Sequence, residues 1–115
     1  MKTLIVGGTG LVGAETARLM ASKGHEVTLM SRNPTSNPAL SEFAHIAHDY
    51  IKDDISIETL NAFDWLVFSA GADIRMLPEG ESDETFFKHA NSVRVPYFFE
   101  QAAKSNISKA VYIGT

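Results

Sequence analysis

A glycine-rich stretch near the N-terminus, GGTGLVG at residues 7–13, is the feature that most restricts the fold of this chain. It follows the short apolar run Leu4–Val6, which has the character of a buried strand, and it opens a segment with helical spacing of apolar residues over 11–23. Ordering glycine is costly, so four glycines in seven residues indicate that the backbone turns tightly or approaches another group there. A strand, a glycine turn and a helix in this order predict a parallel α/β unit.

Strands and helices alternate along the rest of the chain. The predicted strands are Leu4–Val6, Val27–Met30, Ile46–Tyr50, Trp65–Phe68 and Ala110–Ile113. The predicted helices cover 11–23, 39–43, 56–62 and 83–105, with Pro96 expected to kink or break the last one and an acidic loop at 77–84 before it. This alternation predicts a doubly wound parallel sheet, an α/β fold with strand order 3-2-1-4-5 and no domain boundary within residues 1–115.

Composition excludes several classes of function. The 115 residues contain no cysteine, which excludes disulfides, thiolate catalysis and cysteine metal sites. The net charge of −4 and the absence of a basic block argue against nucleic-acid binding through the phosphate backbone. The sequence shows no signal peptide pattern and no apolar run long enough to cross a membrane, so we expect a soluble cytoplasmic protein.

Three glycines of the stretch have separate expected roles in binding a dinucleotide. Gly7 ends the first strand and permits the tight turn, Gly10 lets the backbone approach a pyrophosphate, and Gly13 lets the helix pack closely on the strand. The helix N-terminus supplies N–H groups and partial positive charge for the phosphates. The ligand is expected at the carboxyl ends of the first and fourth strands, where the sheet order reverses. The alternative is a glycine turn with only a structural role.

The end of the second strand predicts which dinucleotide is preferred. An acid at this position favours the free ribose of NAD, whereas an arginine favours the 2′-phosphate of NADP. This chain has Ser31 and Arg32 there and no acid. A guanidinium binds phosphate bidentately and the serine hydroxyl can add a donor, so NADP is expected, with NAD as the alternative if Arg32 is only a solvated loop residue.

The candidate metal ligands of the sequence are His45, His48 and Asp49, which lie on or near the predicted third strand. Residues three apart on a strand point to opposite faces, so these two imidazoles do not converge on one ion. The sequence therefore predicts no metal.

The chain resembles the N-terminal part of the short-chain dehydrogenase/reductase superfamily, in its extended or atypical branch that includes the NAD-dependent epimerase/dehydratases. GGTGLVG, HDYI at 48–51, DWLVFSAGA at 64–72, KHANSVRVP at 88–96 and KAVYIGT at 109–115 carry the resemblance. It implies a Rossmann fold and a dinucleotide cofactor. The residues then expected at the cofactor are Gly7, Thr9, Gly10, Leu11, Val12, Gly13, Ser31, Arg32, Asp49, Tyr50, Ser69, Ala70, Gly71 and Asn91.

The same resemblance bears on catalysis. The family has a catalytic serine or threonine after the fifth strand, where Thr115 aligns, and a Tyr-x-x-x-Lys pair further on, whose tyrosine serves as acid or base. Tyr97 is followed four residues later by Gln101, so that pair is absent from these 115 residues. We therefore expect the NAD(P)-binding portion of an oxidoreductase or epimerase/dehydratase with an incomplete active site, acting in its full-length parent on a carbonyl or hydroxyl substrate such as a nucleotide sugar.

Two further expectations follow from the resemblance. The alternative function is a non-catalytic NADP-binding sensor or interaction module, which some atypical relatives provide. Extended members of the family use the fourth helix, here 83–105, to form a homodimer.

Overall fold

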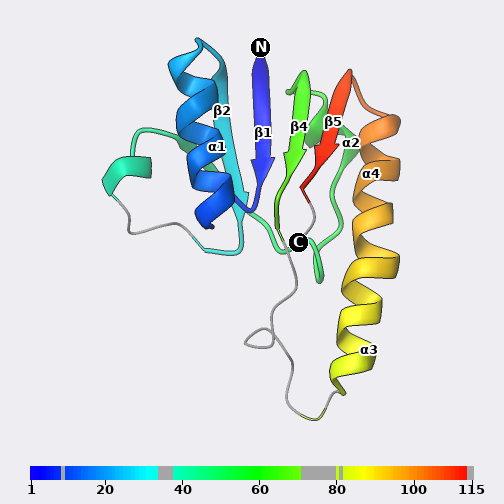
Figure 1. Cartoon of the computed structure of the whole chain (residues 1–115). Helices are drawn as coiled ribbons and strands as arrows, with labels where there is room; N and C mark the ends of the chain where they lie inside the picture. Colours follow the sequence, from blue (N-terminus) through cyan, green and yellow to red (C-terminus); the bar gives the residue numbers. More distant parts are fainter. Residues whose placement is uncertain (9, 34–37, 71–79, 81, 114–115) are drawn as a thin grey trace.

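Five parallel strands form one sheet in the order β3-β2-β1-β4-β5, as the computed structural model of the chain shows (Figure 1). The structure describes residues 1–8, 10–33, 38–70, 80 and 82–113. The strands are β1 (Lys2–Val6), β2 (Glu26–Ser31), β3 (Ala44–Ala47), β4 (Trp65–Phe68) and β5 (Lys109–Tyr112). The predicted fold class and strand order are therefore confirmed.

Alternate residues of the central strands enter two different cores. Leu4 and Val6 of β1 face one side of the sheet, whereas Ile5 between them faces the other. On β4, Leu66 and Phe68 lie on the first side. The two-residue period of a strand explains why these short runs are apolar throughout, since both faces of the sheet are covered.

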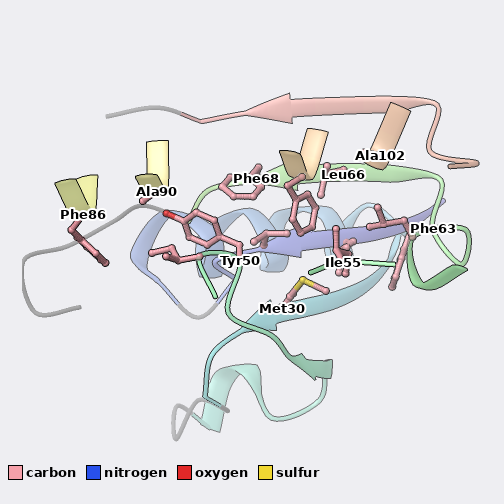
Figure 2. Close-up of a cluster of buried hydrophobic side chains, with 14 residues drawn as sticks. Met30, Tyr50, Ile55, Phe63, Leu66, Phe68, Phe86, Ala90 and Ala102 are labelled. Atoms are coloured by element: carbon pink, nitrogen blue, oxygen red, sulfur yellow. The ribbon is translucent and has the colours of Figure 1, made fainter. Parts of the chain in front are cut away.

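The larger core lies on the side of the sheet covered by α2 (Ile57–Leu60) and α4 (Val95–Ala103) (Figure 2). Its centre is Phe68, which has no solvent exposure and whose ring lies 5.3 Å from that of Phe98 between centroids. Phe86 and Phe98 are fully packed into this core, and Phe87, Tyr97 and Phe99 contact it at its edge. Core packing therefore accounts for the dense aromatic residues of segment 83–105.

The smaller core lies under α1 (Leu11–Ser22) on the opposite side of the sheet. This helix meets the sheet through the small side chains of Ala14 and Ala17, which pack with Ile5 and Val67. At β5 neither face of the sheet is fully covered, since Tyr112, the β5 partner of Phe68 on the larger-core side, is 51% exposed. Val111, the β5 partner of Val67, remains 54% exposed.

The predicted helix over 83–105 is helical almost throughout, but its centre is widened. It consists of α3 (Asp83–Lys88), the π-helix η3 (His89–Arg94) and α4, and the run extends beyond the carboxyl ends of the strands (Figure 1). Pro96 lies in the first turn of α4 and does not break the run. Proline lacks an N–H and crowds the carbonyl four residues earlier, and the wider turn before it relieves that crowding.

The third strand was predicted too late in the sequence. The expectation was Ile46–Tyr50, whereas β3 is Ala44–Ala47 and is followed by a turn. The Asp49 carboxylate accepts the Ile51 N–H at 2.9 Å, and the Asp49 carbonyl accepts the Asp53 N–H at 2.7 Å. Aspartate commonly closes such turns through its own side chain. Tyr50 and Ile51 are apolar because they enter the larger core from this turn.

Two other segments differ in smaller ways. The helix expected over 39–43 is a 3₁₀ turn, η1 (Pro38–Leu40), and half of the acidic loop expected at 77–84 lies outside the described residues. Within the ranges that the structure covers, no helix has both the length and the apolar character needed to cross a membrane.

Tyr50 is packed edge-on against Phe68, with ring centroids 5.2 Å apart (Figure 2). Its hydroxyl is buried and has no hydrogen-bond partner among the described residues. This burial raises the pKa of Tyr50 to about 12, and the proximity of Tyr112 and Asp49 adds to the rise. The fold therefore favours the neutral phenol.

Stability is expected to fall in alkaline solution because of this tyrosine. An unfolded tyrosine titrates near pH 10, so a folded pKa of about 12 means that up to about 3 kcal/mol of stability is lost between pH 10 and 12. Tyr50→Phe is expected to remove this loss and to leave the unfolding free energy at pH 7 within about 1 kcal/mol of wild type. Urea unfolding of both proteins at pH 7 and pH 11 tests this. An equal alkaline loss in both would contradict it.

Candidate functional site

The turn after β1 brings three strand ends together around Gly7. This residue has a φ of +82°, which side-chain-bearing residues rarely adopt. Its N–H donates to the Met30 carbonyl at 2.8 Å, at the end of β2. A Cβ on Gly7 would lie 2.5 Å from the Ala70 nitrogen, just beyond β4. The predicted turn role of Gly7 thus has two causes, its backbone conformation and the close approach of residues 69–70.

Gly13 is required by the contact between α1 and the turn. A Cβ on Gly13 would lie 2.8 Å from both the Gly7 carbonyl carbon and the Gly8 Cα, inside van der Waals contact. Gly8 is also confined, because its Cβ would meet the Leu29 side chain at 2.5 Å. Both glycines are therefore explained by the packing of the chain on itself.

Gly10 differs from the other glycines of the stretch. Among the described residues, a Cβ there would meet only the Gly7 carbonyl oxygen, at 3.4 Å, and its φ of −78° suits any residue. The described chain therefore does not itself require glycine at this position. Space left bare at the start of a helix fits a ligand that approaches the backbone closely, and the phosphates of a dinucleotide are such a ligand.

The first turn of α1 offers donors to such a ligand. The N-cap is Gly10, which has no side chain with which to cap the helix, and the first helical bond runs from the Ala14 N–H to the Gly10 carbonyl at 2.8 Å. The N–H groups of Leu11, Val12 and Gly13 therefore have no partner within the helix. The first turn carries no acidic residue that would repel an anion. The Val12 side chain beside these groups is 52% exposed.

At the end of β2, Ser31 is already hydrogen-bonded. Its hydroxyl donates to the Asn33 carbonyl at 2.7 Å, so its contact with His45 Nε2, also 2.7 Å, must be one that it accepts. The donor that was expected to serve a 2′-phosphate is thus engaged within the chain. Arg32 follows directly and is exposed. His48 lies on the other side of the sheet, its ring edge-on to Phe98, so the two histidines do contact different surroundings.

Ser69 joins β4 to β1 at the point where the strand order reverses. Its N–H and its hydroxyl both donate to the Val6 carbonyl, at 2.8 and 2.9 Å. Ala70 follows and packs against the larger core. The ends of β1, β2 and β4 therefore meet at one edge of the sheet, as predicted, and the glycine turn lies between them.

Beyond β3, Asp49 is half-buried in its turn, and Tyr50 turns its ring into the core. Any contact of Tyr50 with a cofactor therefore falls to its backbone. Asn91 is exposed on η3. The structure connects these two segments through Arg94, which the sequence reasoning did not single out: its Nε donates to the Tyr50 carbonyl at 3.0 Å. The signal in the sequence that could have identified Arg94 was its position as a cationic residue between Val93 and Val95, just before Pro96.

Three expected site residues, Thr9, Gly71 and Thr115, lie outside the described residues. Within the described part of the chain, no three histidine, aspartate or glutamate side chains gather closely enough to hold a metal ion.

Comparisons with known proteins agree with this architecture. The chain is 50% identical over 34 residues to the human Epimerase family protein SDR39U1, a match that covers 30% of this chain and 12% of that protein. Two crystal structures share the fold. UDP-N-acetylglucosamine 4-epimerase from Bacillus cereus matches with a TM-score of 0.72 at 23% identity, over 100% of this chain and 40% of that one. UDP-glucose-4-epimerase from Stenotrophomonas maltophila, with bound NAD and formylated UDP-arabinopyranose, matches with a TM-score of 0.75 at 16% identity, over 97% of this chain and 36% of that one.

The chain thus spans less than half the length of each of these proteins. A model of the NAD dependent epimerase/dehydratase family matches residues 3–115. Its match includes the glycine turn, the strand ends around it and the helical run with Asn91. The chain belongs to the NAD-dependent epimerase/dehydratase family.

Proposed function

We propose that this chain is the dinucleotide-binding portion of an oxidoreductase or epimerase/dehydratase, and that it binds NADP in preference to NAD. The observation that carries the proposal is Gly10, because its missing side chain leaves space beside the first-turn N–H groups that the described chain does not fill. Family membership supports a nicotinamide dinucleotide as the ligand of that space.

The segments that follow the different strands are expected to contact different parts of the cofactor. The first-turn N–H groups of α1 would hold the diphosphate, and Asp49 would accept a hydrogen bond from the adenine amino group. Residues 69–71 and Asn91 would line the path toward the nicotinamide. When bound, the dinucleotide supplies or accepts a hydride, and the residues described here bind and orient it.

The NADP preference rests on charge at the end of β2. Arg32 is exposed there, and Ser31 and Asn33 beside it are uncharged. A carboxylate at this position would repel a 2′-phosphate, whereas a guanidinium attracts it. Because the Ser31 proton is engaged with Asn33, Arg32 is the principal group proposed to select NADP.

The substrate and the reaction belong to the same proposal. Two similar structures are epimerases of UDP-linked sugars by name, which supports a carbonyl or hydroxyl substrate such as a nucleotide sugar. Thr115 remains the proposed catalytic threonine. The cytoplasmic location and a homodimer through the helical run 83–105 are also proposed.

Calorimetric titration of the purified chain tests the proposal directly. We expect NADPH to bind at least about tenfold more tightly than NADH, because a phosphate–guanidinium pair contributes about 1.5 kcal/mol or more. We also expect no oxidation of NADPH with sugar or carbonyl substrates, since residues 1–115 contain no Tyr-x-x-x-Lys pair. A folded chain that bound neither nucleotide would contradict the cofactor assignment, and tighter binding of NADH would contradict the NADP preference.

A further inference from the structure

We propose that Arg94 is a positioning residue that fixes the Asp49 carboxylate where it recognises the adenine base. This inference rests on the proposed function, since it assumes that Asp49 faces the adenine. Arg94 itself is not expected to touch the cofactor. Its effect is transmitted through the turn that follows β3.

One guanidinium holds both sides of that turn. Its Nε donates to the Tyr50 carbonyl at 3.0 Å, and one terminal nitrogen donates to the Asp53 carbonyl and, at 3.1 Å, to the Asp54 carboxylate. Tyr50 directly follows Asp49, and Asp53 closes the turn back onto it. The planar guanidinium therefore fixes the direction of two carbonyl groups at once, which a single flexible ammonium cannot do.

The Arg94 side chain is itself held in place. It is only 12% exposed, although Asp54 is 80% exposed, and its guanidinium carbon lies 4.6 Å from the centroid of the Tyr97 ring. The same helical run holds the next part of the loop, because Gln101 Nε2 donates to the Ile55 carbonyl at 3.1 Å. The chain after β3 is thus attached to η3 and α4 along its backbone. These contacts make Arg94 a rigid support rather than a surface cation.

The Asp49 carboxylate moves only if this turn moves. The Asp49 N–H donates to the Asp53 carboxylate at 2.9 Å, and Asp49 Oδ1 accepts the Ile51 N–H at 2.9 Å. These two hydrogen bonds fix the orientation of the Asp49 side chain relative to the backbone of the turn. Its Oδ2 has no hydrogen-bond partner within the described ranges and is the oxygen available to an amino group. Asn91, three residues before Arg94 on η3, is attached to the same support.

The adenine base provides a readout that distinguishes positioning from general stability. The 6-amino group of adenine is a donor, whereas hypoxanthine carries an acceptor oxygen at that place, which a carboxylate repels. We therefore measure Kd for NADPH and for its hypoxanthine analogue by calorimetry. Wild type is expected to favour NADPH by about tenfold or more, as a hydrogen bond to a charged acceptor provides. Arg94→Lys is expected to reduce this ratio to below about threefold.

Two variants calibrate the measurement. Asp49→Ala should remove the preference for adenine. Arg18→Lys makes the same exchange at an exposed arginine that pairs with Glu15 on α1, and it should leave the ratio at the wild-type value. Should Arg94→Lys lack the thermal unfolding transition of a folded protein, Asp54→Ala replaces it. That variant frees the guanidinium from its side-chain partner, and we expect the ratio to fall about twofold.

The outcomes separate this inference from the proposed function. If wild type binds no dinucleotide, the proposed function is wrong and this inference is wrong with it. If wild type binds NADPH without favouring adenine, the role of Asp49 is wrong. If wild type favours adenine and a folded Arg94→Lys, or Asp54→Ala in its place, keeps the full ratio, only the positioning role of Arg94 is overturned.

Discussion

Exchange of Gly13 for alanine is expected to lower the free energy of unfolding by about 1–3 kcal/mol, the usual cost of overfilling a packed site. The new methyl group would press against the Gly7 carbonyl and the Gly8 Cα, and both belong to the backbone. Backbone at a turn fixed by three strand ends cannot move aside cheaply. The gain in helix propensity, at most about 1 kcal/mol, does not offset this cost.

The same exchange at Gly10 is expected to leave stability within about 1 kcal/mol of wild type. Within the described part of the chain the methyl group meets only one oxygen, at 3.4 Å, and the φ of −78° is unstrained. Alanine is a poorer N-cap than glycine, but it also restricts the unfolded chain, and these two effects nearly cancel. NADPH affinity, in contrast, should fall by about 100-fold or more, because the methyl group occupies the space proposed for the diphosphate.

Urea unfolding and NADPH calorimetry of Gly13→Ala and Gly10→Ala distinguish a loss of stability from a loss of cofactor binding. Gly13→Ala should lose stability, and Gly10→Ala should lose binding while it remains folded. The pair is matched, since both exchanges add one methyl group within four residues of each other. Undiminished NADPH affinity in Gly10→Ala would show that the bare backbone at this position serves no ligand.

Arg32→Ala is expected to weaken NADPH binding by about 10- to 100-fold and to leave NADH binding unchanged. A charge-assisted bond to the 2′-phosphate is worth about 1.5–3 kcal/mol, and NADH has no 2′-phosphate with which to form that bond. Arg32 is exposed, so the fold should not suffer. The loss should also shrink as salt is added, because ions screen an exposed charge pair.

Arg18→Ala is the matched control for this experiment. It removes an exposed arginine of α1 that pairs with Glu15, and thus changes the net charge equally. Calorimetry of both variants with both nucleotides should show a selective effect at Arg32 alone. An equal loss for NADPH and NADH would place Arg32 near a shared part of the cofactor, and no loss for either would place the 2′-phosphate elsewhere.

Local chemistry made most of the fold predictable from the sequence. Gly7 follows the first strand and Gly13 lies in the first turn of the helix, and the structure requires glycine at both positions. The strand order followed from the alternation of elements and the handedness of their connections. The third strand was predicted to extend too far along the sequence. The apolar residues Tyr50 and Ile51 belong to the larger core, but they reach it from the turn after β3 and not from the strand.

The interactions within the site were less predictable, because they join residues far apart in the chain. Ser31 and His45 are 14 positions apart and meet only because β2 and β3 pair in this register. Arg94 contacts the Tyr50 carbonyl across 44 positions. Neither pattern has a local signature. Sequence reasoning therefore brought the ends of the first, second and fourth strands together but ended the third strand too late. It did not foresee which side chains at these strand ends are already engaged.

The different side chains through which α1 and α4 pack on the sheet have a consequence for how ligand and fold depend on one another. The helix whose first turn would receive the diphosphate rests on the sheet through small side chains, whereas α4 rests on aromatic ones. Elements with little buried apolar surface open locally at the lowest cost in free energy. A ligand that binds only the closed form of α1 lowers the population of the open form by mass action. The concentration of free dinucleotide would then govern how often this part of the backbone exchanges its amide hydrogens or meets a protease.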